Sequence, residues 1–360
     1  MRISDVCLVR YLDGLESPRI TIMSRYINSR KGLIAFLILL SGLVWVQLFE
    51  NPFAVFTTMI GILLFSVYDI SAPTSSRLKE LLIHGAVSVF CTPVAIICGN
   101  FLPTSIVLLF FFVFLSSMAM AVGNRLTKSL FMTNAWLMIA LAMSGGLEKA
   151  LTASLCLLAG GCVYLLLSSI AKTDPSTSFS EASSIEECTA AKHKATSHLT
   201  IASPVSQFAL LRSFSVSLAL FIGWQLFEST PFWMAYTVFF VIRPGLDYSL
   251  KPAIERGAGT LLGTILGLYT VLIWGGDGSL VKLLLVLALS ICIAEGGNRY
   301  YLFVTLLTYA LLLYLAISGT EIAIMANKRL LATLLGICIA LITIIFLKYL
   351  PRLLQPHNPG

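Results

Sequence analysis

Apolar runs of about 20 residues recur along this sequence from Leu33 to Leu350, and they constrain its fold more than any other feature. A helix of that length spans about 30 Å, the thickness of the hydrocarbon core of a membrane. That core offers no water to backbone groups, so each run must be a helix or a strand of a closed barrel. Since the runs are continuous rather than alternating, they indicate helices. The composition agrees, because 58% of the residues are hydrophobic and 11% are charged, against roughly a quarter charged in soluble domains.

The apolar runs fall into two sets of six. We therefore predict an all-α membrane protein with about 12 transmembrane helices, arranged as two parallel six-helix repeats. The predicted spans are 33–50, 52–68, 80–101, 104–122, 128–145 and 149–171, then 207–228, 230–244, 257–275, 279–297, 300–318 and 328–350. The predicted domains are a cytoplasmic N-terminal segment (1–32), a first membrane repeat (33–171), a cytoplasmic linker (172–206), a second membrane repeat (207–350) and a cytoplasmic tail (351–360).

Short motifs recur in the same order in the two sets, which indicates an internal duplication. Residues 47–50 and 225–228 both read Gln-Leu-Phe-Glu, and Thr58 then matches Thr237. Because each set holds an even number of spans, both sets enter the membrane in the same direction, which makes the repeats parallel. A Gly-Asn-Arg motif precedes the fifth span and again the eleventh, and its two copies contribute Asn124, Arg125, Asn298 and Arg299.

Basic residues are distributed unevenly over the predicted loops. With the N-terminus inside, the outer side holds Lys149, Lys282, Lys328 and Arg329, and the other 20 of the 24 Lys and Arg residues lie on the inner side. An excess of Lys and Arg marks the cytoplasmic side of a membrane protein. We therefore expect both termini and the linker in the cytoplasm. We interpret the net charge of +7 as a topology signal rather than as a surface for nucleic acid.

The sequence contains no motif for catalysis or for a bound cofactor. There is no phosphate-binding loop G-x-x-x-x-G-K-[ST], no G-x-S-x-G elbow and no H-E-x-x-H. The four histidines lack metal-ligand spacing, and the eight cysteines contain no C-x-x-C pair. We therefore expect no enzymatic activity, no cofactor, no metal ion and no disulfide, and transport or conduction is the default function.

Three glycines, Gly259, Gly263 and Gly267, form two overlapping G-x-x-x-G steps in the second set of spans. Glycines at this spacing let another helix approach closely, so we predict helix packing along this face.

Two arginines, Arg243 and Arg256, flank a predicted inner loop that also holds Asp247 and Lys251. One interpretation is that they set the topology and extend their side chains to the membrane interface. The other is that they form a cytoplasmic vestibule that attracts anions. The residues alone leave both interpretations open.

An aromatic-rich span, a proline-bearing inner loop and then Arg-x-x-Gly-Thr-x-x-Gly resemble the fusaric acid resistance superfamily. The residues Arg256, Gly259, Thr260 and Gly263 carry the match, and the two six-span units extend it over nearly the whole chain. That superfamily includes bacterial exporters of aromatic carboxylic acids and, more distantly, plant aluminium-activated malate channels. The first half departs from the pattern, since Arg77 is followed by Leu-Lys-Glu-Leu-Leu-Ile-His-Gly. The chain also has only the linker where larger exporters carry a helical cytoplasmic domain.

The resemblance implies an exporter of organic, aromatic carboxylic acids in a bacterial inner membrane, driven by an ion gradient. Besides membrane lipid, it implies a periplasmic adaptor of the membrane fusion type as a partner, and a homo-oligomer stays open. Two rival functions are an organic-anion channel and a non-transporting membrane subunit of an efflux complex.

The predicted spans hold almost no ionisable group near their middle, so Glu295 is the one candidate for coupling transport to an ion gradient. The predicted substrate pathway comprises Arg243, Asp247, Arg256, Thr260, Asn298, Arg299, Asn124, Arg125, Thr58 and Thr237.

Overall fold

A computed structural model describes residues 52–68, 74–121, 124–170, 203–227, 230–244, 246–276, 278–295 and 299–353. Within these ranges the chain forms eleven α-helices and one short 3-10 helix, and it forms no strand. The α-helices are α4 (Pro52–Tyr68), α5 (Thr74–Cys98), α6 (Leu102–Met118), α7 (Asn124–Ala142), α8 (Leu147–Ile170), α10 (Pro204–Leu226), α11 (Phe232–Val241), α12 (Leu246–Trp274), α13 (Ser279–Glu295), α14 (Tyr300–Ile317) and α15 (Ile322–Leu353). The all-α prediction is therefore confirmed for the described residues.

Each of these helices coincides with one predicted span. Six of them, α5, α8, α10, α12, α14 and α15, are long and apolar enough to cross a membrane by length and composition. Four more, α4, α6, α7 and α11, are apolar but shorter. The predicted span 33–50 and nearly all of the linker lie outside the described residues. Twelve crossings therefore remain a prediction.

Local sequence explains where α10 and α11 begin. The Ser203 hydroxyl accepts a hydrogen bond from the Ser206 N–H at 3.1 Å, and Pro204 occupies the first turn of α10, where its missing N–H is not needed. In the same way Pro231 directly precedes α11. At the other end, α11 ends at Val241, shortly before Arg243, whose helical conformation is disfavoured by the following Pro244.

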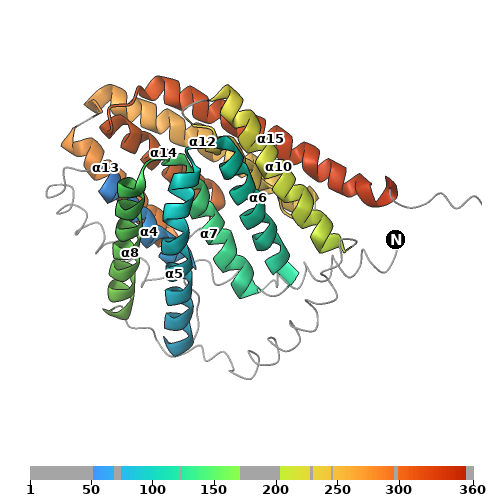
Figure 1. The fold of residues 1–360 in the computed structure, drawn as a ribbon. Helices are drawn as coiled ribbons and strands as arrows, with labels where there is room; N and C mark the ends of the chain where they lie inside the picture. Colours follow the sequence, from blue (N-terminus) through green and yellow to red (C-terminus); the bar gives the residue numbers. More distant parts are fainter. Residues whose placement is uncertain are drawn as a thin grey trace, which may run out of the picture.

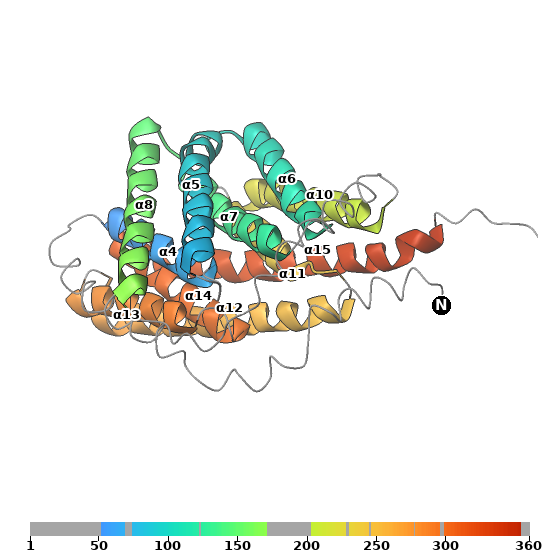
Figure 2. The same ribbon diagram turned by 90° about the horizontal axis from the view of Figure 1, so that it is seen from below.

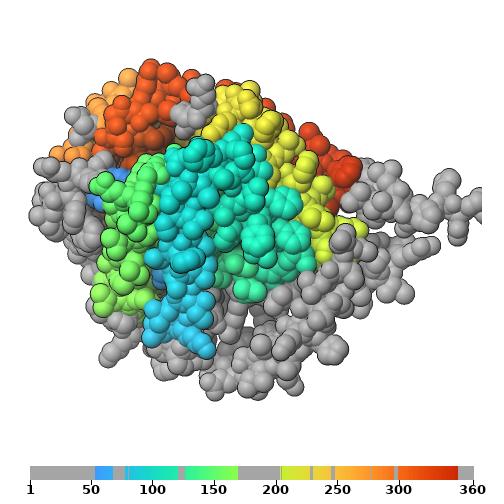
Figure 3. Space-filling view, in the orientation of Figure 1, coloured from blue at the N-terminus to red at the C-terminus, as the bar shows by residue number. Residues whose placement is uncertain are grey.

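The helices form two layers that run across each other. Figure 1 and Figure 2 show α5, α6, α7 and α8 side by side in one layer, while α12 and α15 cross behind it. The space-filling view in Figure 3 shows the outer face of the first layer, with α10 along its edge beside α6. The two halves meet where α6 packs on α10, α4 on α13 and α7 on α11.

Helices α4 and α11 form the middle of the protein. All side chains of α4 from Val55 to Ser66 are buried, as are nearly all of α11. Both helices pack on the last helix of their own half, α4 on α8 and α11 on α15. The same pairing recurs elsewhere, since α5 packs on α7 and α8, and α12 packs on α14 and α15.

Glycines mark the corresponding close approaches. A Cβ on Gly160 of α8 would clash with the backbone of Thr58 in α4, and one on Gly336 of α15 would lie 2.9 Å from the Thr237 Cβ in α11. Thr58 and Thr237 are the pair that the sequence motifs align. The two positions that match in sequence therefore make the same kind of contact in the structure.

Candidate functional site

Helix α11 is too short to cross a membrane on its own. Its ten residues, Phe232–Val241, span about 15 Å, half of a hydrocarbon core. It is surrounded by α7, α10, α12 and α15, and it presents Trp233, Tyr236, Phe239 and Phe240 to them. A short aromatic helix therefore lies at the centre of the second half.

Three buried arginines surround α11: Arg212 from α10, Arg256 from α12 and Arg329 from α15. They expose only 5%, 1% and 3% of their surface, and all three lie in helices apolar enough to cross a membrane. Each guanidinium lies over an aromatic ring of α11, with Arg212 4.4 Å from the Phe239 centroid, Arg256 4.9 Å from that of Tyr236 and Arg329 5.2 Å from that of Trp233. Ring faces attract cations, and more so when water is excluded.

Arg212 makes the strongest polar contacts of the three. Its Nη2 donates to the Phe239 carbonyl at 2.8 Å, and its Nη1 donates to the Ser117 hydroxyl at 3.3 Å. The Phe239 carbonyl belongs to the last turn of α11, where carbonyls have no partner within the helix and a positive charge is favourable. Arg212 therefore caps α11 and joins it to α6 in the other half.

Arg256 and Arg329 differ from Arg212, because the described residues supply neither of them with a hydrogen bond or an acidic partner. The buried Nε and Nη2 of Arg256 and the buried Nε of Arg329 have no acceptor there. Tyr236 interacts electrostatically with both guanidinium groups. A buried charge without a counter-charge costs several kcal/mol, and ring contacts of about 2 kcal/mol offset only part of that. This pair of arginines is therefore suited to receive an anion.

Buried hydroxyl groups continue the polar surface beside Arg256. Thr260 and Thr264 follow Arg256 at four-residue intervals, so the three side chains share one face of α12. The hydroxyls of Thr260, Thr264 and of Thr308 on α14 are buried without a hydrogen-bond partner in the described part of the chain, and so is the Tyr300 hydroxyl. Other buried threonines, such as Thr305 and Thr333, donate to the carbonyl four residues earlier, although Thr57 and Thr133 are also unpaired in the described residues. The unpaired hydroxyls are therefore available to a ligand or to water.

The predicted glycine face packs against α14. A Cβ on Gly259 would lie 2.7 Å from the Tyr301 carbonyl oxygen, one on Gly263 would lie 2.9 Å from the Thr308 Cβ, and one on Gly267 would lie 3.0 Å from Leu312. These contacts hold α14 against α12 and place Thr308 beside Gly263. The glycines therefore shape the site without binding anything themselves.

The structure brings together some of the residues predicted as a pathway and separates others. Arg256, Thr260 and Thr237 lie where α11, α12 and α15 meet, whereas Thr58 lies between α4 and α8. Arg243 and Arg299 are exposed at helix ends. Glu295, at the end of α13, is half-buried and lies near the Ile293 carbonyl that accepts a hydrogen bond from Ser66 of α4. Asn298 and the side chains of Asn124, Arg125 and Asp247 lie outside the described residues.

Two helices begin earlier than the predicted spans, and each carries a buried arginine. Helix α12 begins at Leu246 rather than at 257, and α15 begins at Ile322 rather than at 328, so Arg256 and Arg329 lie inside these helices. Arg329 was predicted at an outer span end, and Arg212 was counted only as an inner-side charge. The signal that could have found them is the cost of any charge within an apolar segment, which makes such a residue a functional candidate.

The first half does not repeat this polar face. The duplication aligns Arg77 with Arg256, and the position four residues later holds Leu81, which is buried and apolar, where α12 has Thr260. The side chain of Arg77 lies outside the described residues. The hydroxyl-lined face is therefore a feature of the second half.

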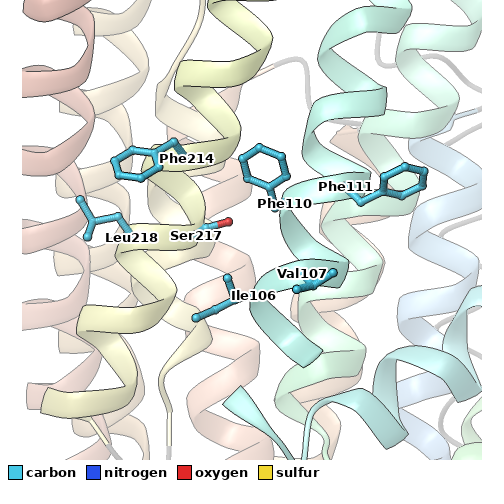
Figure 4. Close-up of a pocket in the computed structure, with 7 residues that line it drawn as sticks. All are labelled: Ile106, Val107, Phe110, Phe111, Phe214, Ser217 and Leu218. Atoms are coloured by element: carbon cyan, nitrogen blue, oxygen red, sulfur yellow. The ribbon is translucent and has the colours of Figure 1, made fainter. Parts of the chain in front are cut away.

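A groove of about 410 Å³ between α6 and α10 is chemically different (Figure 4). Its lining residues are Ile106, Val107, Phe110, Phe111, Phe214, Ser217 and Leu218. None of them carries a charge, so a carboxylate would have no cationic partner there. The groove is therefore unsuited to hold the charged end of an organic anion.

Comparison with protein families tests the resemblance that the sequence motif suggests. The family model described as fusaric acid resistance protein-like matches residues 214–343. The resemblance predicted from the sequence is confirmed over these residues. The fusaric acid resistance-like segment contains α11, α12 and the arginines Arg256 and Arg329, whereas Arg212 lies just before it. Comparison with curated proteins found no match, and neither did comparison with solved structures.

Proposed function

We propose that this multi-pass membrane protein exports organic anions, and that α11, α12 and α15 form the site that binds them. The observation that carries the proposal is the guanidinium of Arg256, which is buried, lies over Tyr236 and Phe240, and has two nitrogens without an acceptor in the described residues. Guanidinium groups bind carboxylates through two parallel hydrogen bonds, and the neighbouring rings suit an apolar body. The fusaric acid resistance-like segment supports transport rather than catalysis.

The substrates in this proposal are aromatic carboxylic acids. The rings of Trp233, Tyr236 and Phe240 beside the arginines supply the contacts that a planar organic acid needs and that an inorganic ion does not use. Export is driven by an ion gradient, with Glu295 as the coupling residue. Its place at the end of α13, next to the contact between Ser66 and Ile293 that joins the two halves, supports a role in a movement of one half against the other.

The proposal includes twelve crossings in two parallel repeats, with both termini on the cytoplasmic side of a bacterial inner membrane. Since α11 is short, non-helical residues next to it, buried in the protein, would complete the eighth crossing. The recurring helix pairs and the matched contacts of Thr58 with Gly160 and Thr237 with Gly336 support the duplication. The excess of basic residues in the predicted inner loops supports the orientation. Transport past a second membrane would use a periplasmic adaptor protein as a partner.

The test is uptake of a labelled aromatic acid such as benzoate into liposomes that contain the purified protein. Arg256→Lys retains the charge but loses the planar fork, so it should lower transport about 10-fold, and Arg256→Gln should lower it further. Lys79→Gln, an exposed basic residue of α5 outside the predicted pathway, is the control for a loss of charge and should transport like the wild type. Wild-type transport by both Arg256 variants would remove this residue from the site.

The same liposomes separate the exporter from its rivals. A coupled exporter accumulates substrate against its concentration gradient and stops when a protonophore collapses a driving proton gradient. Large unitary currents in planar bilayers would instead identify a channel. Absence of any anion flux from well-folded protein would favour a non-transporting subunit.

A further inference from the structure

We infer that the site takes a dianion, in which two acid groups are held on a planar apolar scaffold, and that Arg329 receives the second acid group. This inference rests on the proposed function, since it concerns the same site. Arg329 lies in the matched segment but outside the sequence motif, and the match gives it no binding role. The argument uses the position of Arg329 relative to Arg256, the charge of the pair and the contrast with Arg212.

The side chains of Arg256 and Arg329 contact neighbouring residues of α11. Arg329 lies over Trp233 and Arg256 lies over Tyr236, and residues three apart are neighbours on one face of a helix. Arg329 also lies in the field of Arg256. Two positive charges therefore face one short aromatic surface from two different helices.

The charge of the pair sets the charge of its ligand. Each guanidinium is almost fully buried, and among the described residues neither has a carboxylate beside it. A monoanion would neutralise one of them and leave the other uncompensated in a low-dielectric interior, where charges interact strongly. A ligand with two negative charges neutralises both arginines at once.

The surroundings limit the scaffold that carries the two acid groups. The rings of Trp233, Tyr236 and Phe240 lie against the two guanidinium groups, so a flat apolar spacer suits this surface better than a flexible polar one. Benzene dicarboxylates have this character. The unpaired hydroxyls of Thr260 and Tyr300 are available for the remaining acid oxygens.

Arg212 shows that burial alone does not make a binding residue. It is buried and lies over rings as the other two do, but it donates to the Phe239 carbonyl and to Ser117. Two of its guanidinium nitrogens are therefore satisfied within the protein. The Nε of Arg212 also lacks an acceptor, but its other two nitrogens are hydrogen-bonded, whereas Arg256 and Arg329 make no hydrogen bond within the described residues.

The experiment compares benzoate with isophthalate (benzene-1,3-dicarboxylate), which share a ring and differ by one carboxylate. Binding to the purified wild-type protein is measured by calorimetry, and transport is measured in liposomes. We expect isophthalate to bind at least about 10-fold more tightly than benzoate, with one molecule per site, because a hydrogen bond to a charged group contributes about a factor of 10 or more. Arg329→Gln should abolish this preference and leave benzoate binding within about threefold of the wild type.

Lys328→Gln is the control for a change of net charge at the neighbouring position, and it should retain the preference for isophthalate. Arg329→Lys keeps the charge, so it remains informative if Arg329→Gln does not fold. It should retain a reduced preference for isophthalate over benzoate. Equal affinities of the two acids in the wild type, two benzoate molecules per site, or an equal loss for both acids in Arg329→Gln and Arg329→Lys would each overturn the inference. The proposed function fails separately, if neither acid is transported or if Arg256→Gln transports both like the wild type.

Discussion

Replacing Gly259 by alanine tests whether the glycine face of α12 holds the site together. The added Cβ would lie 2.7 Å from the Tyr301 carbonyl oxygen and 2.9 Å from the Val304 Cβ, both on α14. Ordinary contacts of these atom types are about 3.3 Å and about 3.7 Å, so α12 and α14 must separate by roughly 0.6 to 0.8 Å. Because the first clashing atom belongs to backbone, no side-chain rotation relieves it.

The magnitude follows from two opposing effects. Overpacking of a well-packed contact destabilises by about 1–3 kcal/mol, and a clash with backbone belongs at the upper end, about 3 kcal/mol. Alanine instead of glycine within a helix stabilises by about 1 kcal/mol. The net loss in free energy of unfolding for Gly259→Ala is therefore about 2 kcal/mol.

Gly257 of the same helix is the matched control. The nearest atom to a Cβ at that position is the Ile337 Cδ1 at 3.5 Å, which is ordinary contact. Gly257→Ala should therefore be stabilising by about 1 kcal/mol, which separates the two variants by about 3 kcal/mol. The assay is equilibrium unfolding in mixed micelles, followed by circular dichroism. Free energies within about 0.5 kcal/mol of each other would refute the packing argument.

Three further predictions follow from other parts of the chain. Trp136→Phe removes the 2.7 Å hydrogen bond from the indole Nε1 to the buried Thr92 hydroxyl, and the same unfolding assay should show a loss of about 1–3 kcal/mol. A cysteine introduced between residues 172 and 204 of a cysteine-free variant should react with an impermeant reagent only after cell lysis, and reaction in intact cells would reverse the predicted orientation. Glu295→Gln should retain downhill flux of an aromatic acid but lose accumulation against a gradient, whereas wild-type accumulation would remove Glu295 from coupling.

The helices could be predicted from the sequence because the membrane imposes a length on every apolar run. Helix ends were less predictable, since a hydropathy pattern ends at the first charged residue whether or not the helix does. Helix α12 shows this, because it begins at Leu246 and carries Asp247 and Lys251 before its apolar part. The prediction placed its start at 257, one residue after Arg256, and so left that arginine at a loop end.

The site could be predicted in part. Arg256 and Thr260 were found because they stand in a recognisable pattern with Gly259 and Gly263, and close helix packing requires that pattern. Arg329 stands in no pattern, and its role follows from the ring of Trp233 on a helix almost 100 residues away in sequence. Contacts of that kind depend on how helices pack, which hydropathy and spacing do not specify.

The three arginines around α11 have different roles: one stabilises the end of the helix, and two are proposed to bind the substrate. A helix that ends inside the protein leaves carbonyl groups without partners, and Arg212 satisfies one of them at Phe239. The side of α11 that carries Trp233 and Tyr236 offers the other two arginines only ring faces, because its carbonyls there are used within the helix. The early end of α11 therefore explains why one arginine finds a hydrogen-bond acceptor in the protein, while the two beside the uninterrupted part of the helix are proposed to bind an anion.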